Sequence, residues 1–188
     1  MKRLLLIGLL GLLPLMSSAQ IWTVQTNLLD WAALGTVNTE VGMSLSQHFS
    51  LVAGGRLNPW EFTDKKHDIF VHNQQKTVYL GVRYWPWYVN SGFWFAAKAQ
   101  YVPSFSVTGL WSKAIYEGKN GIGGVLSAGY TFMLSKHFNL EAGIGGWAGV
   151  FQNYGVYNSQ ANNNYIREEG RKTCVLPDQV SLSLVYVF

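Results

Sequence analysis

Hydrophobic and polar side chains alternate along much of this chain, with a period of two residues. Such alternation predicts β-strands with one apolar and one polar face, because successive side chains of a strand point to opposite faces. Turn-forming Gly, Ser, Asn and Pro separate the alternating segments. The strands predicted in this way cover approximately residues 22–29, 37–46, 50–60, 77–87, 93–102, 124–134, 140–151 and 180–188.

The connections between these strands differ in length on the two sides of the predicted sheet. Short connections fall at 46–49, 88–91 and 135–138, and long ones at about 62–76, 105–121 and 152–173. The connection near residues 34–36 is an exception, since it is short on the side of the long loops. Short turns opposite longer loops are typical of outer-membrane barrels, in which the turns face the periplasm. We therefore predict an all-β fold, an eight-stranded antiparallel up-and-down transmembrane β-barrel, with a soluble β-sandwich as the alternative.

The last predicted strand reaches the final residue, with no polar tail behind it. In a closed barrel the last strand pairs with the first, so the chain can end on a strand without leaving an open edge. Its apolar face resembles the C-terminal sorting signal of bacterial outer-membrane proteins, which implies recognition by the barrel-assembly machinery. The residues of this predicted signal are Leu182, Leu184, Tyr186 and Phe188.

The N-terminus has the pattern of an export signal. Lys2 and Arg3 precede an apolar run at 4–13, and small residues lead to a predicted cleavage site between Ala19 and Gln20. The alternative is a membrane anchor, but a spanning helix needs about 20 apolar residues. We expect residues 1–19 to be a cleaved signal peptide and residues 20–188 to be a single barrel domain in the outer membrane of a Gram-negative bacterium.

Composition fits this prediction. Charged residues make up 13% of the chain and aromatic residues 15%, which suits a protein with a large apolar outer surface. Removal of Lys2 and Arg3 leaves twelve basic and ten acidic residues, so charge gives no reason to expect a nucleic-acid partner. Cys174 is the only cysteine, so no internal disulfide can form.

Charged residues in the middle of predicted strands are expected to face the barrel interior. A charge that faces lipid at mid-depth costs about 2–4 kcal/mol, and an eight-stranded barrel is just wide enough to be filled by side chains. These residues should therefore form a cluster of paired charges in the lumen, the alternative being a proton or ion path. The cluster consists of Glu40, Arg56, Arg83, Lys98 and Glu141.

Aromatic residues lie near the predicted strand ends or on predicted lipid-facing positions. Rings with a polar edge prefer the headgroup level of a bilayer and form girdles there. Aromatic core packing in a soluble sheet would explain their number but not these positions. The residues are Trp22, Tyr84, Trp87, Phe93, Tyr101, Tyr130, Phe132, Tyr186 and Phe188.

Three short motifs suggest chemistry that we do not favour. Gly-Ile-Gly-Gly at 121–124 and 143–146 is not followed by a helix, so glycines that make room in a narrow lumen are the better interpretation than a phosphate loop. His48 and Ser50 match the His-x-Ser pair of lipid A deacylases in type, but they lie in a predicted periplasmic turn, whereas lipid A is in the outer leaflet. The third motif is a candidate metal site in the loop at 62–76, with ligands of loose spacing: Asp64, His67, Asp68 and His72.

Four segments together resemble one known family. They are QTNLLDWAALGTVNTEVGMSLSQHFSL, LNPWEF, VRYWPW and VSLSLVYVF, and they extend over nearly the whole mature chain. The family is domain-of-unknown-function family 3575, small outer-membrane barrels of Bacteroides-type bacteria. Leu176–Gln179 matches the family's stretch before the last strand only loosely. The resemblance implies an outer-membrane barrel and a genomic association with surface fimbriae, and it transfers no functional residues.

Taken together, the sequence predicts a non-enzymatic outer-membrane barrel without cofactors, with a structural or surface-interaction role. Its expected partners are outer-membrane lipid, the barrel-assembly machinery during insertion, and a fimbrial or host-surface partner that contacts the outer loops. The last of these loops, 152–172, is rich in Tyr and Asn and is the first candidate for that contact. A lipid-modifying enzyme of the deacylase type and a small transport pore are the alternative functions.

Overall fold

The computed structural model describes residues 21–32, 35–64, 69–108, 114–158 and 165–188. Almost all of them are in β-strands. The elements of the described residues are β1 (Trp22–Asn27), α2 (Leu28–Ala32), β2 (Val37–Ser44), β3 (Phe49–Asn58), β4 (Glu61–Asp64), β5 (Ile69–Tyr84), β6 (Gly92–Thr108), β7 (Ala114–Met133), β8 (Phe138–Asn158), β9 (Tyr165–Glu169) and β10 (Lys172–Val187). No helix among these residues is long and apolar enough to span a membrane.

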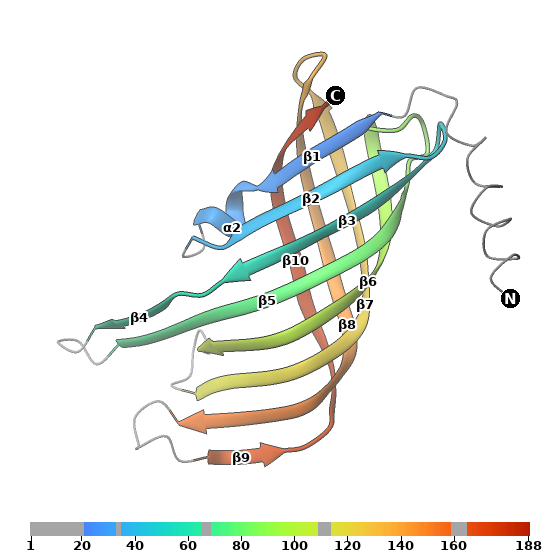
Figure 1. The fold of residues 1–188 in the computed structure, drawn as a ribbon. Coiled ribbons are helices and arrows are strands. Elements are labelled where there is room, and N and C mark those ends of the chain that lie inside the picture. Colours follow the sequence, from blue (N-terminus) through green and yellow to red (C-terminus); the bar gives the residue numbers. More distant parts are fainter. Residues whose placement is uncertain (1–20, 33–34, 65–68, 109–113, 159–164) are drawn as a thin grey trace, which may run out of the picture.

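Eight of the strands close into an antiparallel barrel (Figure 1). Strands β1, β2, β3, β5, β6, β7 and β8 pair in chain order, and β10 pairs with both β8 and β1. The two remaining strands lengthen hairpins at one end of the barrel, since β4 pairs with β5 and β9 pairs with β8. The predicted fold class, an all-β eight-stranded antiparallel barrel, is confirmed.

The short turns all lie at one end of the barrel, which we call the turn end. Two of them have similar sequences and the same contacts. Leu45 N–H donates to Phe49 C=O at 2.9 Å, and Leu134 N–H donates to Phe138 C=O at 3.0 Å. The histidine inside each turn then reaches the end of a neighbouring strand.

The other end of the barrel, which we call the wide end, differs from the prediction. Most of the residues predicted as long loops continue the strands, because their backbone groups stay paired with the neighbouring strands beyond the predicted boundaries. Thus β5 begins at Ile69, β6 continues to Thr108, and β8 continues to Asn158. Alternation fades in these extensions, which is why the sequence pattern placed loops there. The wall formed by β5 to β8 is therefore taller than the wall formed by β1 and β2 (Figure 1).

The first strand is shorter than predicted and ends in a helical turn. Asn27 Oδ1 accepts a hydrogen bond from Leu29 N–H at 3.2 Å, as an asparagine at a helix N-cap does. The turn ends at Gly35, which has a φ of 70° and donates its N–H to Trp31 C=O at 3.0 Å. The short connection near residues 34–36 thus follows one helical turn, α2, that the alternation did not predict.

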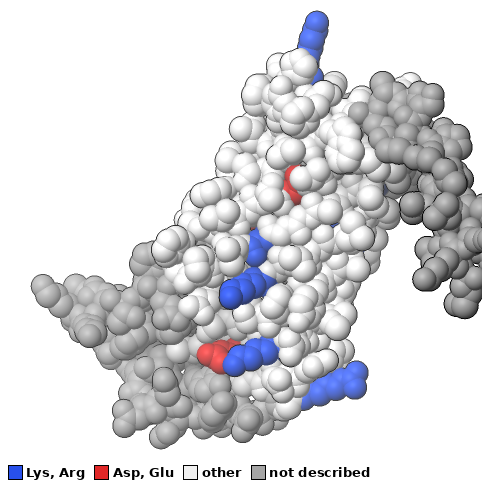
Figure 2. Space-filling model, in the orientation of Figure 1, with Lys and Arg blue, Asp and Glu red and all other residues white. Residues whose placement is uncertain are grey.

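The barrel has a polar interior and an apolar exterior. Buried interior positions include Ser50, Thr77, Ser127, Thr131, Ser181 and Ser183. Large hydrophobic side chains between them on the same strands point outward and are exposed, among them Val78, Leu80, Val82, Phe95, Leu126, Ile144 and Val180. Much of the face shown in Figure 2 has no charged side chain. A soluble domain would have the opposite distribution, with its large hydrophobic residues in the core.

Aromatic side chains on the outer surface gather at the turn end. Ring pairs with centroids 4.7–5.8 Å apart link Trp87 to Phe93, Phe93 to Tyr130, and Tyr130 to Phe132. A second group contains Phe138, Tyr186 and Phe188, and Phe49 contacts Tyr84. Apart from the half-buried Tyr130, the rings predicted as a girdle are all exposed: Trp22, Tyr84, Trp87, Phe93, Tyr101, Phe132, Tyr186 and Phe188.

Candidate functional site: the lumen of the barrel

The lumen contains a layer of buried charges near the turn end. Arg83 of β5 lies between two carboxylates, with Nη2 2.5 Å from Glu40 Oε1 on β2 and Nη1 2.8 Å from Glu141 Oε2 on β8. Lys98 Nζ of β6 lies 2.7 Å from Glu40 Oε2. All four side chains are almost fully buried. Four of the five residues predicted as a lumen charge cluster therefore contact one another; we call these four residues the charged layer.

Neighbouring polar groups complete the hydrogen bonds of the two carboxylates. Gln25 Nε2 donates to Glu40 Oε1 at 2.9 Å, and Thr131 Oγ1 donates to Glu141 Oε1 at 3.0 Å. A buried charge is tolerated only when it is paired and hydrogen-bonded, and both glutamates meet this condition. The result is a connected polar network that crosses the barrel from β1 and β2 to β7 and β8.

Two tryptophans fill the lumen between the charged layer and the turn end. The guanidinium carbon of Arg83 lies 4.4 Å from the ring centre of Trp94 and 6.0 Å from that of Trp85. Both indoles are 1% exposed. Glycines next to Trp94 make room for its ring. A Cβ built on Gly129 would lie 2.4 Å from Trp94 Cζ2, and a Cβ built on Gly143 would lie 2.9 Å from the same atom.

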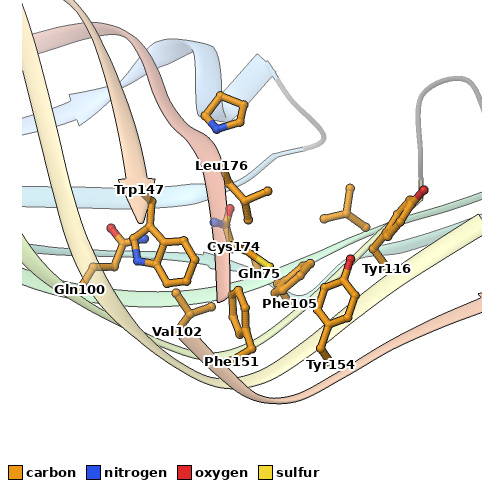
Figure 3. Close-up of a pocket in the computed structure, with 12 residues that line it drawn as sticks. Gln75, Gln100, Val102, Phe105, Tyr116, Trp147, Phe151, Tyr154, Cys174 and Leu176 are labelled. Carbon is orange, nitrogen blue, oxygen red and sulfur yellow. The ribbon is translucent and has the colours of Figure 1, made fainter. Parts of the chain in front are cut away.

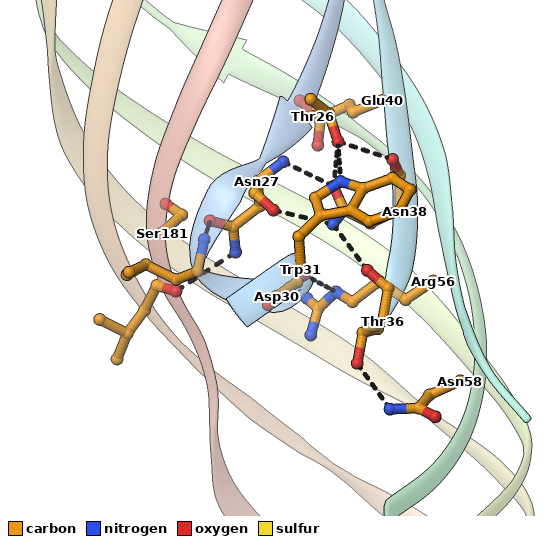
Figure 4. Close-up of polar contacts among 12 residues, drawn as sticks. Thr26, Asn27, Asp30, Trp31, Thr36, Asn38, Glu40, Arg56, Asn58 and Ser181 are labelled. Carbon is orange, nitrogen blue, oxygen red and sulfur yellow. Dashed lines mark hydrogen bonds and ion pairs between the residues drawn. The ribbon is translucent and has the colours of Figure 1, made fainter. Parts of the chain in front are cut away.

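The fifth predicted residue, Arg56, belongs to a different network. Its Nε lies 3.9 Å from Asp30 Oδ2 of α2, on the side of the wide end (Figure 4). Sequence reasoning identified Arg56 as an inward charge but did not find Asp30, because the helical turn that carries it was not predicted.

Asparagine side chains hold this second network together. Asn38 Oδ1 accepts the N–H of Asn27 at 2.6 Å, and Asn38 Nδ2 donates to Asn27 C=O at 3.0 Å (Figure 4). Asn58 Nδ2 donates to Thr36 Oγ1 at 2.8 Å. The sequence analysis did not identify these residues as a group, although each lies on the polar face of a predicted strand or next to a predicted strand.

An apolar pocket occupies the lumen on the wide-end side of the charged layer (Figure 3). Its volume is about 480 Å³. Its walls are built on a core of buried side chains, namely Val102, Trp147 and Phe151, with Phe105 packed against them. Ring centroids of Trp147 and Phe151 are 5.0 Å apart, and those of Phe105 and Phe151 are 4.9 Å apart.

The sequence analysis missed this pocket, although it contained a usable signal. Trp147 shares its strand phase with Glu141, which was predicted to face inward, and continuing the period of two places Gly149 and Phe151 on the same face. Glycines opposite them provide the space, because a Cβ on Gly121 would lie 2.3 Å from Phe151 Cε1 and one on Gly123 2.7 Å from Trp147 Cε2. The predicted role of the Gly-Ile-Gly-Gly glycines agrees with these contacts.

The predicted assembly signal lies on the outer surface of β10. Leu184, Tyr186 and Phe188 are exposed, and Leu182 is half-buried on the same face. Phe188 N–H donates to Trp22 C=O at 3.0 Å and Val187 N–H to His137 C=O at 2.8 Å, so hydrogen bonds hold the last residues to both neighbours. Recognition by the assembly machinery stays a prediction. The predicted cleavage site at Ala19 and Gln20 lies outside the described residues.

The side chains of the His-x-Ser motif contact different atoms of the same tryptophan. Nδ1 of His48 lies 3.0 Å from Trp85 C=O, which requires a proton on Nδ1, and Ser50 Oγ accepts the indole N–H of Trp85 at 3.0 Å. Ser50 points into the lumen and is 4% exposed. This geometry gives both residues a structural role at the turn end.

The candidate metal ligands lie in a region that is described only in part. His67 and Asp68 lie outside the described residues, and Asp64 and His72 belong to the paired strands β4 and β5. Elsewhere in the described part of the chain, no group of three or more His, Cys, Asp or Glu side chains could hold a metal ion.

The fold and the lumen define a closed β-barrel whose interior is polar at the turn end and apolar toward the wide end. The model of one protein family, described as "Protein of unknown function (DUF3575)", matches residues 4–188, so the chain belongs to this family. The family resemblance seen in the sequence is thereby confirmed, whereas its Bacteroides-type origin stays a prediction. Curated proteins include no match to the chain.

Proposed function

We propose that this protein is an outer-membrane β-barrel of a Gram-negative bacterium with a non-enzymatic, structural or surface-contact role. The observation that carries the proposal is the inverted distribution of side chains, apolar outside and charged inside. Exposed outward residues such as Leu80, Leu126 and Ile144, at 54%, 74% and 69% exposure, would be costly in water as one continuous surface. In lipid the same surface is favourable, because the bilayer core is apolar.

The dimensions of the barrel support placement in a bilayer. Ten strand residues rise about 23 Å along the barrel axis when the strand is tilted by about 45°. An outer-membrane barrel has an apolar band about 25 Å tall. The outward apolar residues of β10 run from Phe188 to Val180, and Val175 continues them with 79% exposure. The aromatic rings at the turn end would then lie at the periplasmic interface.

The charged layer favours a closed lumen over a transport pore. Arg83 contacts both glutamates and Lys98 contacts Glu40, at distances of 2.5–2.8 Å. The buried rings of Trp85 and Trp94 fill the space next to them. An eight-stranded barrel leaves just enough room for side chains. Planar-bilayer recordings of the purified protein should therefore show no steady ion conductance, and a stable conductance would favour the pore.

A deacylase-type enzyme is less well supported than a structural role. Nucleophilic catalysis by serine requires a base that hydrogen-bonds the serine hydroxyl. Here both His48 and Ser50 bond to Trp85 instead. Replacing either residue by Ala should leave the acyl pattern of lipid A unchanged, and an altered pattern with an intact barrel would favour the enzyme.

The tall hairpins at the wide end are the part of the molecule best placed for surface contacts. Strands β8 and β9 form such a ribbon, which continues for several residue pairs beyond the last contact of β8 with β10 at Phe151. The family resemblance implies a genomic association with fimbriae. We propose that this ribbon contacts a fimbrial or host-surface protein, and that its polar composition suits such recognition.

The experiment compares cells that lack the protein with cells that carry shortened hairpins. One variant replaces residues 157–166 by Asn-Gly, a turn that closes the ribbon between the paired residues Val156 and Arg167. A matched control shortens the hairpin of β6 and β7 by replacing residues 109–114 in the same way, between the paired residues Thr108 and Ile115. Loss of fimbriae or of host-surface binding in the first variant, but not in the control, is the expected result. Unchanged fimbriae and binding in cells without the protein would contradict the proposed contact role.

A further inference from the structure

We propose that the apolar pocket in the lumen is a binding site for a single acyl chain, carried by a membrane lipid or by a free fatty acid. The site goes beyond the proposed function, since a structural or surface-contact barrel needs no ligand, but entry from lipid rests on the proposed placement in the outer membrane. It is also distinct from the charged layer, which lies nearer the turn end. The inference rests on the lining of the pocket, its size and its position beside an open strand edge.

The lining of the pocket matches an apolar ligand. Side chains from four strands face one another in Figure 3: Val102 and Phe105 of β6, Trp147 and Phe151 of β8, Tyr116 of β7 and Leu176 of β10. None of these six is charged. A volume of about 480 Å³ falls inside the range of small-molecule sites, about 300–1,000 Å³.

The lining of the pocket also includes a few polar side chains. Gln75, Gln100, Tyr116 and Tyr154 are among the residues that line it. Apolar walls with a few polar groups are the usual composition of a ligand site.

One wall of the pocket borders an open strand edge. Strand β10 pairs with β8 along its whole length, from Lys172 to Tyr186, but β1 pairs with it only at residues 183–187. Beyond that, the side chain of Asn27 accepts Leu182 N–H at 3.0 Å and donates to Val180 C=O at 3.3 Å. No described strand pairs with this edge of β10 from Lys172 to Gln179, and the element that contacts β10 beyond β1 is the short helical turn α2.

The open edge lies at a height where lipid chains are available. Pro177 is ten residues from Val187, so it lies about 23 Å above the turn end for a strand tilted by about 45°. That height is close to the far boundary of an apolar band about 25 Å tall. Leu176 and Pro177 line the pocket, while Val175 between Leu176 and Cys174 points outward with 79% exposure. An acyl chain could therefore enter from the outer leaflet through the edge, or from outside through the wide end.

The test uses residues 20–188, folded in detergent and transferred to a steroid-based detergent, which has no long alkyl chain to compete for the pocket. Native mass spectrometry would count the palmitic acid molecules bound during a titration. The reaction of Cys174, the only cysteine, with N-ethylmaleimide would report occupancy independently, because Cys174 lines the pocket. Leu176→Trp fills the pocket, and Val175→Trp places the same ring on the outer face of the same strand as the matched control.

We expect saturable binding of one palmitate per chain and a several-fold slower reaction of Cys174 at saturation. Leu176→Trp should lose the bound palmitate, and Val175→Trp should keep it. The proposal would be overturned if the unmodified chain showed no saturable palmitate binding and an unchanged reaction of Cys174. This outcome does not depend on whether Leu176→Trp folds. Equal binding by the two tryptophan variants would also overturn it, since the acyl chain would then lie on the outer surface.

Extraction of the lipids that stay bound to the protein purified from outer membranes distinguishes the two sources of the acyl chain. A phospholipid or lipid A recovered in a fixed ratio to protein supports entry from the membrane. Palmitate or another free fatty acid in that ratio supports entry from outside. Both outcomes require the same pocket, and neither depends on whether the wide end contacts a fimbrial protein.

Discussion

Arg83 and Glu141 face each other across the lumen, with Arg83 Nη1 2.8 Å from Glu141 Oε2, although 58 residues separate them in the sequence. Arg83 also binds Glu40, so one guanidinium connects β5 with β2 and with β8. The three strands come from different parts of the wall. This contact therefore depends on barrel closure, and it places the strongest electrostatic interactions of the interior where water is excluded.

Replacement of Arg83 by Met should destabilise the barrel strongly. The change leaves Glu141 buried without its cation, and breaking a buried pair from one side costs about 3–5 kcal/mol. The free energy of unfolding can be measured in lipid vesicles by urea titration with tryptophan fluorescence. Lys76→Met is the control, because Lys76 lies on the same strand and is exposed. A loss below about 1 kcal/mol for Arg83→Met, typical of an exposed pair, would contradict the buried network.

Gly129 and Gly124 lie on the same strand and should respond differently to a methyl group. A Cβ on Gly129 would lie 2.4 Å from both Trp94 Cζ2 and Ala142 C=O, whereas the nearest atom to a Cβ on Gly124 is 3.8 Å away. Gly129→Ala should lower the free energy of unfolding by about 1–3 kcal/mol, as overpacking does. Gly124→Ala should change it by less than about 0.5 kcal/mol. The same urea titration measures both, and equal effects would show that Trp94 is not confined by the wall.

The turn histidines should stabilise the turn end through single hydrogen bonds. His48 Nδ1 lies 3.0 Å from Trp85 C=O, and His137 Nδ1 lies 2.9 Å from Val187 C=O. His48→Ala should cost about 0.5–1.5 kcal/mol of stability, the usual net value of one hydrogen bond. His137→Ala should cost less, because His137 is exposed. Gln47→Ala is the matched control in the same turn. If Gln47→Ala lowered the stability as much as His48→Ala does, the His48 hydrogen bond would not explain the effect.

Phe188 should matter more for assembly in the cell than for the stability of the folded barrel. Its side chain is 66% exposed on the outer face, so little packing is lost in Phe188→Ser. In cells this variant should reduce the amount of folded protein in the outer membrane, whereas refolding from urea into vesicles should stay close to normal. Leu134→Ser, which removes another outward apolar residue at the turn end, 62% exposed, is the control. Normal assembly of Phe188→Ser in cells would exclude the sorting role.

The strands and the direction of their side chains could be predicted, because both depend on local alternation of apolar and polar residues. Leu80 and Arg83 lie on opposite phases of one strand, and a charge on the lipid side is costly, so their directions follow from the sequence. The contact between Arg83 and Glu141 could not be predicted, because it depends on which strands face each other across the closed barrel. Register and closure are properties of the whole sheet.

The wide end was predicted poorly for a physical reason. There the strands are held together by backbone pairing, as between Ser104 and Lys119 or between Glu117 and Gly155, and the Gly and polar residues at 117–121 interrupt the alternation. The pattern was therefore interpreted as loop. The pocket was missed for the opposite reason, because Trp147 and Phe151 are apolar residues on the inner face, where a barrel interior is expected to be polar.

The central claim is that this chain forms a closed barrel in the outer membrane. The most direct test separates inner and outer membranes and runs the extracted protein on a gel with and without boiling. A closed barrel stays folded in detergent until it is heated. We predict that the protein is in the outer-membrane fraction and migrates differently after boiling. A soluble periplasmic protein whose migration does not change on boiling would contradict the claim, together with the assignment of the apolar exterior to lipid.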